Sequence, residues 1–480
     1  MDNKFKEFNL NENIIKALNN MKYIEPSQVQ KETIPNILKE EDIIVKSQTG
    51  SGKTASFGIP LCEKINIEKT YVQALILVPT RELAMQVKEE ISNIGRLKKV
   101  RVAAVFGKQP MNEQIRELKQ RVHIVVGTPG RISDHINRKT LNLEEVKFLV
   151  IDEADKMLSM GFIDQIKDIL DKISQKRSTA LFSATIPNEI EKLCEKYMNK
   201  PKVLEIISKV FNRERIEESY LSIEHKDKFK ALWKVIYANN PEGSIVFCNT
   251  KDKVKEVSSL MKSEGIIIGE LHGDMEQKKR LQIIEDFKNK KFKVLIATDV
   301  AARGIHIDHI DLVINYEVPM EKESYIHRIG RTGRAGNFGK AISFVSSGEK
   351  RFLNQIEEYI TYNIKEDEMP DNEKIKVGRK LFKESQRELI KNKQVVKKNI
   401  HNDIIKIHIN GGKKKKIRAL DILGCFSNLP GLTGEDIGII DIQEGFSYVD
   451  ILNGKGREIL KKYKEVTVKG KKIKIQYAKK

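Results

Sequence analysis

The stretch Phe148-Leu149-Val150-Ile151-Asp152-Glu153-Ala154-Asp155 combines four apolar residues with three carboxylates around one alanine. Such a run is typical of a buried parallel strand whose carboxyl end carries charge. Open α/β sheets bind ligands in the crevice at the carboxyl ends of their strands, so Asp152 and Glu153 are predicted to lie at a ligand site. Taken alone, acidic residues after a strand are more often an N-cap or a solvated turn.

A second stretch favours the ligand site over an N-cap or a solvated turn. Residues 42–46 are predicted to form a strand, followed by the glycine-rich turn Ser47-Gln48-Thr49-Gly50-Ser51-Gly52-Lys53-Thr54. This turn fits the phosphate loop in all but its first glycine, which is Ser47 here. Backbone N–H groups of such a loop cradle phosphates, while Lys53 would reach the β/γ-phosphates and Thr54 would offer its hydroxyl to Mg²⁺. Asp152 then becomes a candidate Mg²⁺ partner and Glu153 the group that orients the attacking water. The predicted nucleotide-binding residues of the loop are Gly50, Ser51, Gly52, Lys53 and Thr54.

Length and composition indicate several domains and an anionic partner. A chain of 480 residues with 40% apolar content is too long for one core and suggests about three domains. The formal charge of +20 favours a polyanionic partner, although it is equally compatible with a merely soluble protein. Residues 371–480 hold 27 Lys and Arg against 13 Asp and Glu, so this last part carries +14 of the +20.

The cysteines and the amino terminus indicate the compartment. Cys62, Cys194, Cys248 and Cys425 are scattered without a Cys-x-x-Cys pair or metal-ligand spacing, so neither a disulfide framework nor a zinc site is predicted. The first residues contain no apolar targeting core, and the chain has no long uninterrupted apolar run. We therefore expect a soluble, cytoplasmic protein.

Strand-like apolar segments alternate with helix-length segments in two successive series, which is typical of doubly wound parallel sheets in α/β domains. The first series is predicted at residues 42–46, 74–78, 101–106, 123–126, 148–151 and 179–182, and the second at 244–248, 266–271, 293–297, 312–315 and 340–345. Only the first half has a phosphate loop, so only the first domain is expected to cradle a nucleotide by itself.

The end of the chain changes character. Residues 374–398 are basic with an expected helix, and residues 403–480 then follow the order βαββαβ. That order in so short a segment is the ferredoxin-like, α+β topology used by RNA-recognition modules. We therefore predict domains at residues 1–208 and 209–367, a basic linker at 368–402, and a small RRM-like domain at 403–480, called the module below.

Arginines in the second domain complete a phosphoryl-transfer site. In His327-Arg328-Ile329-Gly330-Arg331-Thr332-Gly333-Arg334, three arginines stand three residues apart in a glycine-punctuated segment. Arginine makes bidentate contacts with phosphate, so the segment is predicted to supply an arginine finger, the alternative being a solvated basic face.

Over residues 1 to about 365 the chain resembles a DEAD-box RNA helicase, an ATP-dependent enzyme with two tandem RecA-like domains. The motifs that carry the resemblance follow the family's order, at residues 26–30, 47–54, 79–84, 128–131, 152–155, 183–185 and 327–334.

The resemblance implies roles for matching residues. Gln30 would read the adenine edge with Phe5 stacked on the ring, and Asp299 and Gly304 would lie near the nucleotide. Ser183, Thr185 and His327, with Asp155, would couple the nucleotide site to domain closure, while Arg331 and Arg334 would contact the γ-phosphate. RNA backbone contacts are implied for Pro79, Thr80, Arg81, Gly107, Thr128, Gly130, Arg131, Thr250, Arg280 and Thr298.

The sequence also departs from this family. Lys22 stands where glycine is usual, Ser27 where threonine is usual, and Lys108 replaces the second glycine of a pair. His306 occupies a position that the family generally fills with an aspartate thought to hydrogen-bond the ATP ribose. A neutral imidazole accepts one hydrogen bond, so we expect a changed nucleotide affinity with activity retained.

The helicase core together with the module is similar to the DbpA/YxiN type of bacterial DEAD-box protein over nearly the whole chain, with close matches at residues 410–418 and 451–456. Those proteins use the module to grip a hairpin of large-subunit ribosomal RNA. Its predicted RNA contacts are Lys413, Lys414, Lys415, Lys416 and Arg418 in a basic loop, with Phe446 and Tyr448 stacking bases. The alternative for the two aromatic rings is packing in the core.

These inferences lead to one principal hypothesis, an RNA-dependent ATPase and helicase that uses ATP and Mg²⁺ and is tethered to ribosomal RNA during large-subunit assembly. An idle RNA clamp and a DNA helicase are the alternatives. No membrane contact and no obligate protein partner are indicated.

Overall fold

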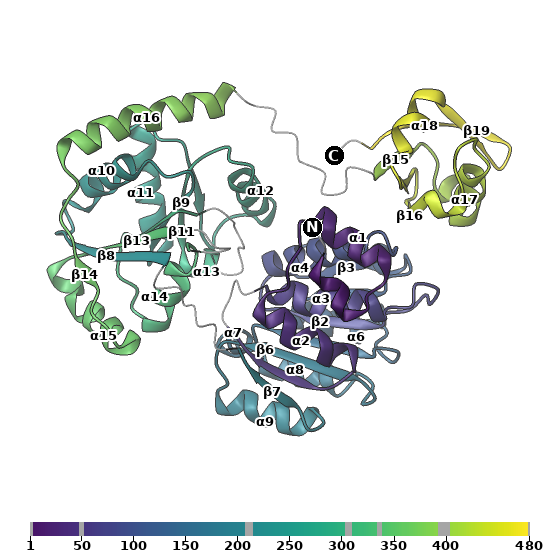
Figure 1. Cartoon of the computed structure of the whole chain (residues 1–480), viewed down its shortest axis with the longest axis horizontal. Coiled ribbons are helices and arrows are strands. Elements are labelled where there is room, and N and C mark those ends of the chain that lie inside the picture. Colours follow the sequence, from purple (N-terminus) through teal and green to yellow (C-terminus); the bar gives the residue numbers. More distant parts are fainter. Residues whose placement is uncertain are drawn as a thin grey trace. The chain divides into compact units, whose positions relative to one another are not determined.

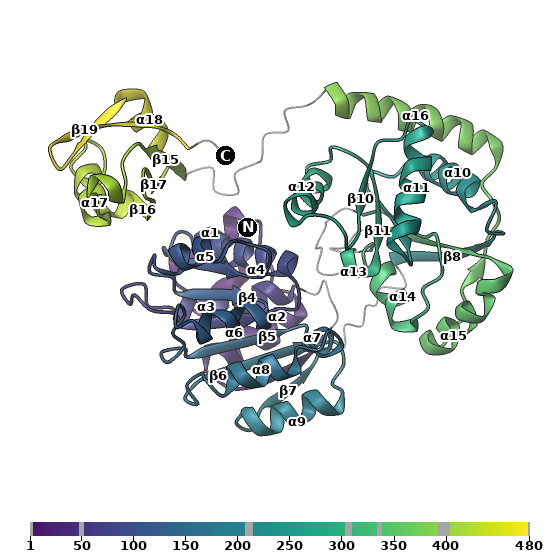
Figure 2. The ribbon, with the colours of Figure 1, turned by 180° about the vertical axis from the view of Figure 1, so that it is seen from behind.

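The structure is a computed structural model that describes residues 3–47, 52–206, 215–302, 310–333, 338–391 and 404–478 (Figures 1 and 2). The described residues divide into two compact units. One contains residues 3–206 together with the module, and the other contains residues 215–391.

The first domain is built on a parallel sheet of seven strands in the order β3-β4-β2-β5-β6-β1-β7. The strands span Ile43–Lys46 (β1), Ala74–Leu77 (β2), Val102–Val105 (β3), Ile124–Gly127 (β4), Phe148–Asp152 (β5), Ser178–Ser183 (β6) and Lys202–Glu205 (β7). The helices span Glu12–Asn20 (α1), Gln28–Leu38 (α2), Lys53–Lys64 (α3), Arg81–Ile94 (α4), Met111–Leu118 (α5), Pro129–Asn137 (α6), Ala154–Ser159 (α7), Ile163–Leu170 (α8) and Asn188–Tyr197 (α9), and a 3-10 turn spans Lys4–Phe8.

Helices cover both faces of this sheet, and each face has its own apolar core. Along β2, Ala74 and Ile76 belong to one core, while Leu75 and Leu77 belong to the other. Successive side chains of a strand point to opposite faces, so a strand covered on both sides must be apolar throughout. The doubly wound sheet predicted from such runs is confirmed.

The second domain repeats the plan with the strand order β10-β11-β9-β12-β13-β8-β14, all in parallel pairs. Its strands span Ile216–Ser222 (β8), Ser244–Cys248 (β9), Ile268–Leu271 (β10), Val294–Thr298 (β11), Leu312–Asn315 (β12), Gly339–Val345 (β13) and Lys365–Glu366 (β14). Its helices span Lys228–Asn239 (α10), Lys251–Ser263 (α11), Gln277–Lys288 (α12), Asp299–Ala302 (α13), Lys322–Ile329 (α14), Lys350–Ile360 (α15) and Asn372–Lys391 (α16), with a 3-10 turn at Ser347–Glu349.

The helix α16 lies within the segment 368–402 that the sequence suggests as a linker, and it packs along α10 on the outside of the second domain (Figures 1 and 2). Ile375 and Phe382 are buried in the same core as Tyr237 of α10, and the Phe382 and Tyr237 ring centroids are 5.6 Å apart. A β-carbon added at Gly378 would lie 1.9 Å from the carbonyl oxygen of Tyr237. The missing side chain of Gly378 therefore allows the two helix backbones to approach closely.

The module is a five-stranded antiparallel sheet in the order β16-β17-β15-β19-β18. Its strands span Ile405–Ile409 (β15), Ile437–Ile442 (β16), Ser447–Ile451 (β17), Glu465–Val468 (β18) and Lys471–Tyr477 (β19), its helices Ala419–Ser427 (α17) and Gly456–Lys462 (α18), and its 3-10 turns Lys413–Lys415 and Gly434–Asp436. The predicted βαββαβ order is present, with the short edge strand β18 added to it.

Cys62, Cys194, Cys248 and Cys425 are free thiols, and the first three are buried. Burial raises the pKa of the Cys62 thiol to about 12 and that of Cys194 to about 11, and it raises the pKa of Cys248 and Cys425 as well. Within the described ranges, no helix is both long and apolar enough to cross a membrane.

Candidate functional site

The strand order of the first domain separates the predicted motifs into two groups. Strands β5, β6 and β1 are neighbours, and their carboxyl ends carry the DEAD segment, the Ser183–Thr185 segment and the phosphate loop. Strands β3, β4 and β2 form the other side of the sheet, and the residues predicted to bind RNA follow them. One edge of one sheet thus carries both groups side by side, and we call them the nucleotide half and the RNA half after the contacts predicted for them.

The two acidic residues at the end of β5 are almost fully buried. Asp152 is 3% exposed and Glu153 is 4% exposed. Glu153 has a left-handed backbone, with φ 56° and ψ 49°, a conformation that is uncommon for residues other than glycine and that costs free energy. Its carboxylate oxygen Oε1 accepts a hydrogen bond from Lys156 Nζ at 2.7 Å, an ion pair that the sequence analysis missed although the i, i+3 spacing on α7 could have revealed it.

The environment of Asp152 suits a bound cation. Burial raises the pKa of Asp152 to about 6, against the opposing effect of the nearby Lys53 ammonium. The carboxylate oxygen Oδ1 is buried without a hydrogen-bond partner among the described residues. A buried carboxylate oxygen of this kind is left for a ligand to satisfy.

The described part of the phosphate loop is stabilised from both sides. Lys53 Nζ donates to the Ser47 carbonyl oxygen at 3.1 Å, and the Ser47 N–H donates to the Ser183 carbonyl oxygen at 3.0 Å. Gln30 Nε2 donates to the Gly52 carbonyl oxygen at 3.2 Å, which places the predicted adenine reader beside the loop. Phe5 is fully buried next to Phe8, so no exposed ring face is presented for the predicted adenine stacking.

Asp155 joins the DEAD segment to the segment after β6. Its carboxylate oxygen Oδ2 accepts hydrogen bonds from the backbone N–H groups of Ala184 and Thr185 and from the Thr185 hydroxyl, at 3.1–3.3 Å. The Asp155 N–H in turn donates to Ser183 Oγ at 3.1 Å. A displacement of either segment would therefore be transmitted to the other.

The predicted RNA contacts of the first domain lie together at the other half of the edge. Thr80 and Thr128 are the N-caps of α4 and α6, and Arg131 Nη1 donates to the Gln109 carbonyl oxygen at 3.0 Å. The Arg81 guanidinium lies against Gly107, where an added β-carbon would be 3.3 Å away. Nothing lies within 4 Å of the corresponding position at Gly130, so the backbone there is open to a close approach by a ligand. Pro79 lies between β2 and Thr80, the N-cap of α4.

In the second domain, Asp299 is engaged by an arginine that the sequence did not single out as a partner. Arg328 is 1% exposed, and its Nε and Nη2 each donate to a carboxylate oxygen of Asp299 at 2.6 Å. The same guanidinium donates to Asn249 Oδ1 and to the Glu317 carbonyl oxygen, both at 2.7 Å. This bidentate contact, in which the Arg328 side chain is buried and the Asp299 side chain is partly exposed, holds α14 against the carboxyl ends of β9 and β11.

The remaining predicted residues of this domain are placed around that pair. Arg331 is 4% exposed, and its Nε donates to the His327 carbonyl oxygen at 3.2 Å. Thr250 is the N-cap of α11, Thr298 ends β11, and Arg280 Nη2 donates to the Ala301 carbonyl oxygen at 2.9 Å. The predicted residues Gly50, Ser51, Gly304, His306 and Arg334 lie outside the described residues.

Two of the departures from the family pattern have a backbone explanation. Lys22 and Lys108 have φ values of 63° and 60°, in the left-handed region that glycine enters without cost. Lysines at these positions are strained by their own β-carbons.

The module carries two distinct surfaces. On the outer face of the sheet, the rings of His408, Phe446 and Tyr448 form a cluster with centroids 5.3–5.5 Å apart. All three are half-buried and lie outside the module's apolar core, so they do not pack in it. The basic loop holds exposed lysines at 413, 414, 415 and 416, followed by the exposed Arg418.

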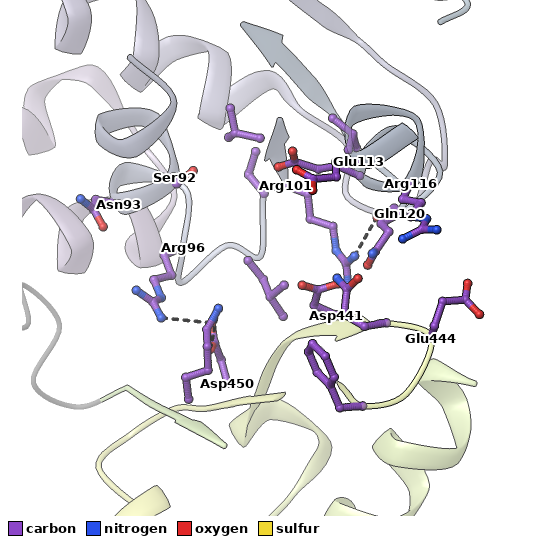
Figure 3. Close-up of a pocket in the computed structure, with 18 of the residues that line it drawn as sticks. Ser92, Asn93, Arg96, Arg101, Glu113, Arg116, Gln120, Asp441, Glu444 and Asp450 are labelled. Atoms are coloured by element: carbon purple, nitrogen blue, oxygen red, sulfur yellow. Dashed lines mark hydrogen bonds and ion pairs between the residues drawn. The ribbon is translucent and has the colours of Figure 1, made fainter. Parts of the chain in front are cut away.

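A hollow of about 690 Å³ in the first unit is lined by the end of α4, the segment between α4 and β3, and α5 with its flanking residues (Figure 3). The module lines its other side with acidic, neutral and basic residues, among them Asp441, Glu444 and Asp450. Arg96 Nη2 lies 3.2 Å from the carboxylate oxygen Oδ2 of Asp450, and Arg101 donates to the Ile440 carbonyl oxygen. Because Arg101 precedes β3, this hollow lies at the amino end of that strand, away from the edge that carries the motifs.

Two α/β domains with these motifs at the carboxyl ends of their strands define the class of ATP-dependent RNA helicases. The family model of the DEAD/DEAH box helicase matches residues 27–193, that of the helicase conserved C-terminal domain matches residues 227–336, and that of the DbpA RNA binding domain matches residues 406–477. The chain belongs to the DEAD-box RNA helicases of the DbpA type.

Individual relatives agree with this assignment. The ATP-dependent RNA helicase DbpA of Bacillus subtilis is 48% identical over 99% of both chains. The ATP-dependent RNA helicase CshA of Listeria monocytogenes is 47% identical over 74% of this chain and 68% of its own length. Among solved structures, S. cerevisiae Dbp5 bound to RNA and ADP BeF3 has a TM-score of 0.71 at 32% identity, covering 79% of this chain and 99% of its own. Mss116p bound to ssRNA and AMP-PNP has a TM-score of 0.69 at 32% identity, covering 77% of this chain and 80% of its own.

Proposed function

We propose that the module tethers this RNA helicase to large-subunit ribosomal RNA, and that the two α/β domains open short neighbouring duplexes during assembly of the large subunit in the cytoplasm. The observation that carries the proposal is the exposed run of four lysines on a folded RNA-binding module. A tether is needed because contacts to the RNA backbone position the enzyme without reading sequence.

The basic loop is held in shape by its neighbours. Lys415 Nζ donates to the Asn410 carbonyl oxygen at 2.7 Å, and Lys469 Nζ donates to the Lys416 carbonyl oxygen at 3.1 Å. Lys416 itself has a φ of 56°, which closes the turn. A shaped cluster of ammonium groups can complement a particular fold of an RNA backbone better than a disordered basic tail. The nearby aromatic cluster offers faces on which unpaired bases can stack.

For hydrolysis, we propose that Asp152 and Thr54 hold Mg²⁺ and that Glu153 orients the attacking water. The unsatisfied buried oxygen of Asp152 fits this role, since Mg²⁺ is usually held by one or two carboxylates together with the substrate phosphates. Among the described residues no cluster of three or more His, Cys, Asp or Glu could hold a metal ion alone, so the phosphates would complete the site. When bound, Mg²⁺ would neutralise developing charge on the transferred phosphoryl group.

Lys53 would contact the β/γ-phosphates and Arg331 the γ-phosphate. We expect ATP to bind first to the nucleotide half of the edge, and RNA to the neighbouring half. Within the nucleotide half, the contacts of Asp155 with Ala184 and Thr185 would then transmit a movement of the DEAD segment to the segment after β6.

The tether is tested by RNA-stimulated ATPase titrations with a ribosomal hairpin fragment and with an unrelated RNA, at one fixed salt concentration. We expect the intact protein to need much less ribosomal RNA for half-maximal activity. The quadruple variant K413Q/K414Q/K415Q/K416Q should lose that preference. A control variant, R457Q/K461Q/K462Q/K464Q, removes the same charge from exposed residues elsewhere on the module and should keep it. Identical titration curves for both RNAs with the intact protein would refute the tether.

The hydrolytic assignment has its own test. Glu153→Gln should abolish RNA-stimulated ATP hydrolysis while ATP binding persists. Hydrolysis that survives this substitution would show that another group orients the water, and equal stimulation by single-stranded DNA would favour the DNA helicase alternative.

A further inference from the structure

We propose that the outer face of α16 is a second RNA-binding surface, which holds the phosphate backbone of double-helical RNA. The surface, called the basic stripe, consists of Lys376, Lys380, Lys383 and Arg387. It lies on the second domain, outside both the edge that carries the motifs and the module. The proposal goes beyond the ribosomal tether and does not depend on it.

The spacing of the four residues places them on one face of the helix. They are separated by four, three and four residues, the spacing at which side chains stand above one another along an α-helix. Eleven residues of helix span about 17 Å. Along this length one strand of a nucleic-acid duplex presents about five phosphates. The stripe therefore matches a short run of backbone charges in both sign and extent.

The opposite side of α16 fixes the helix to the domain. Ile375 and Phe382 are buried against α10, Lys293 Nζ lies 5.8 Å from the Phe382 ring centroid, and the Arg379 guanidinium lies 5.7 Å from that of Tyr237. The helix is thus docked along its length, and the basic stripe is held on a rigid support. Less conformational freedom is lost on binding when cations are already arranged in this way.

The four cations have no carboxylate partners within the structure. All are exposed, and in the described part of the chain none of them forms an ion pair. Two carboxylates border the stripe: Glu373 stands three residues before Lys376, and Glu384 stands four residues after Lys380, while Glu388 lies further around the helix. With four cations against two bordering carboxylates, the stripe presents a net positive charge to an anionic ligand.

The position of α16 separates this surface from the predicted RNA contacts of the second domain. Phe382 packs beside Lys293, which precedes β11, whereas Thr298 stands at the carboxyl end of that strand. The stripe would thus hold a part of the RNA other than the single strand in the cleft. A duplex flanking the unwinding site has the required charge density.

The test measures binding of the full-length protein to a duplex RNA of about 20 base pairs with a single-stranded tail, by fluorescence anisotropy between about 50 and 200 mM salt. The variant K376Q/K380Q/K383Q/R387Q removes the basic stripe. We expect its Kd at about 50 mM salt to rise at least tenfold, and the slope of log K against log salt to fall by about 3, because each lost phosphate contact contributes about 0.7–0.9.

The matched control is K226Q/K230Q/K350Q/K365Q. These four lysines are exposed, form no ion pairs in the described structure and belong to the same domain, so the control removes equal charge from other positions. Its Kd should stay within about twofold of the unaltered protein. Equal losses in the two variants would reduce the effect to net charge and overturn the proposal, as would an unchanged Kd in the stripe variant.

A second readout separates this proposal from the ribosomal tether. The stripe variant should weaken binding to ribosomal and unrelated duplex RNA by the same factor, because phosphate contacts carry no sequence information. A loss confined to the ribosomal RNA would assign the stripe to the tether and contradict a general duplex site. If the variant K413Q/K414Q/K415Q/K416Q kept the preference for ribosomal RNA, the tether would be contradicted, but the result expected for the α16 variant would not change.

Discussion

Replacing Gly378 with alanine should loosen α16 from the second domain, although alanine is the better helix former. A β-carbon at this position would lie 1.9 Å from the Tyr237 carbonyl oxygen and 2.8 Å from its carbonyl carbon, whereas real contacts of β-carbons are not shorter than 3.0 Å. Both atoms belong to the backbone of α10, so the contact is relieved only if one helix moves away from the other.

Two opposing contributions set the magnitude. The gain in helix propensity from glycine to alanine is about 1 kcal/mol. Overpacking costs about 1–3 kcal/mol, and separating Phe382 and Ile375 from their core adds up to about 1.5–3 kcal/mol for each side chain. The clash therefore dominates, and we expect a net loss of about 2 kcal/mol in the free energy of unfolding of the second domain.

The single tryptophan of the chain provides the assay. Trp233 lies on α10, and its ring centroid is 5.8 Å from that of Tyr237, so its fluorescence reports on the contact between α10 and α16. In urea titrations, Gly378→Ala should lower the midpoint of the tryptophan transition. As a control, Gly424→Ala in α17 places its β-carbon in open space and should stabilise the module by about 0.5–1 kcal/mol, followed by circular dichroism. An unchanged or higher midpoint for Gly378→Ala would refute the close-approach argument.

Three further predictions follow from other residues. Lys22→Gly and Lys108→Gly should each raise the free energy of unfolding by about 1 kcal/mol, measured by calorimetry. Lys39→Gly is the control, because Lys39 has a φ of −82°, and it should lower the free energy of unfolding. A change in the same direction for all three variants would contradict the strain assigned to positive φ. Burial lowers the pKa of His123 to about 4, so the unfolded chain binds a proton below its ordinary pKa of 6.5 while the folded domain does not. Stability should therefore fall by about 3 kcal/mol between pH 6.5 and 4 and then level off, and His123→Gln should reduce this dependence in denaturation curves at each pH. Arg328→Gln leaves the Asp299 carboxylate without its bidentate partner and should cost about 3–5 kcal/mol in the tryptophan-monitored unfolding of the second domain; a loss below about 1 kcal/mol would show that water replaces the guanidinium.

The sequence predicts the central strands well because they are buried on both faces and are apolar without interruption, as in β2 and β5. It misses β8, a seven-residue strand between β13 and β14, and two edge strands, namely β7, three of whose four residues are exposed, and β14, which has two residues. Edge strands of this kind lack a pattern of their own, since their pairing depends on a neighbour distant in sequence. The docking of α16 is also hidden, because the basic composition of the segment conceals the buried positions Ile375, Gly378 and Phe382.

In the site, too, residues placed by a short motif could be predicted, whereas contacts between residues distant in sequence could not. The carboxyl-end placement of Asp152 and Lys53 follows from motifs that combine a strand with a turn, and the structure brings these two residues together. The engagement of Asp299 by Arg328 could not be predicted, because it joins residues after two different strands and depends on how α14 packs. The full burial of Phe5 likewise depends on tertiary packing.

The buried cysteines make this protein convenient for site-specific labelling. A thiol reacts with a maleimide as its thiolate, and Cys62, Cys194 and Cys248 are both inaccessible and held protonated by burial. Replacing the half-buried Cys425 with serine would leave a chain whose native thiols do not react with maleimide dyes. Pairs of cysteines introduced at exposed positions of the two α/β domains could then carry a donor and an acceptor fluorophore, and ATP and RNA could be added while the distance between the domains is followed in real time.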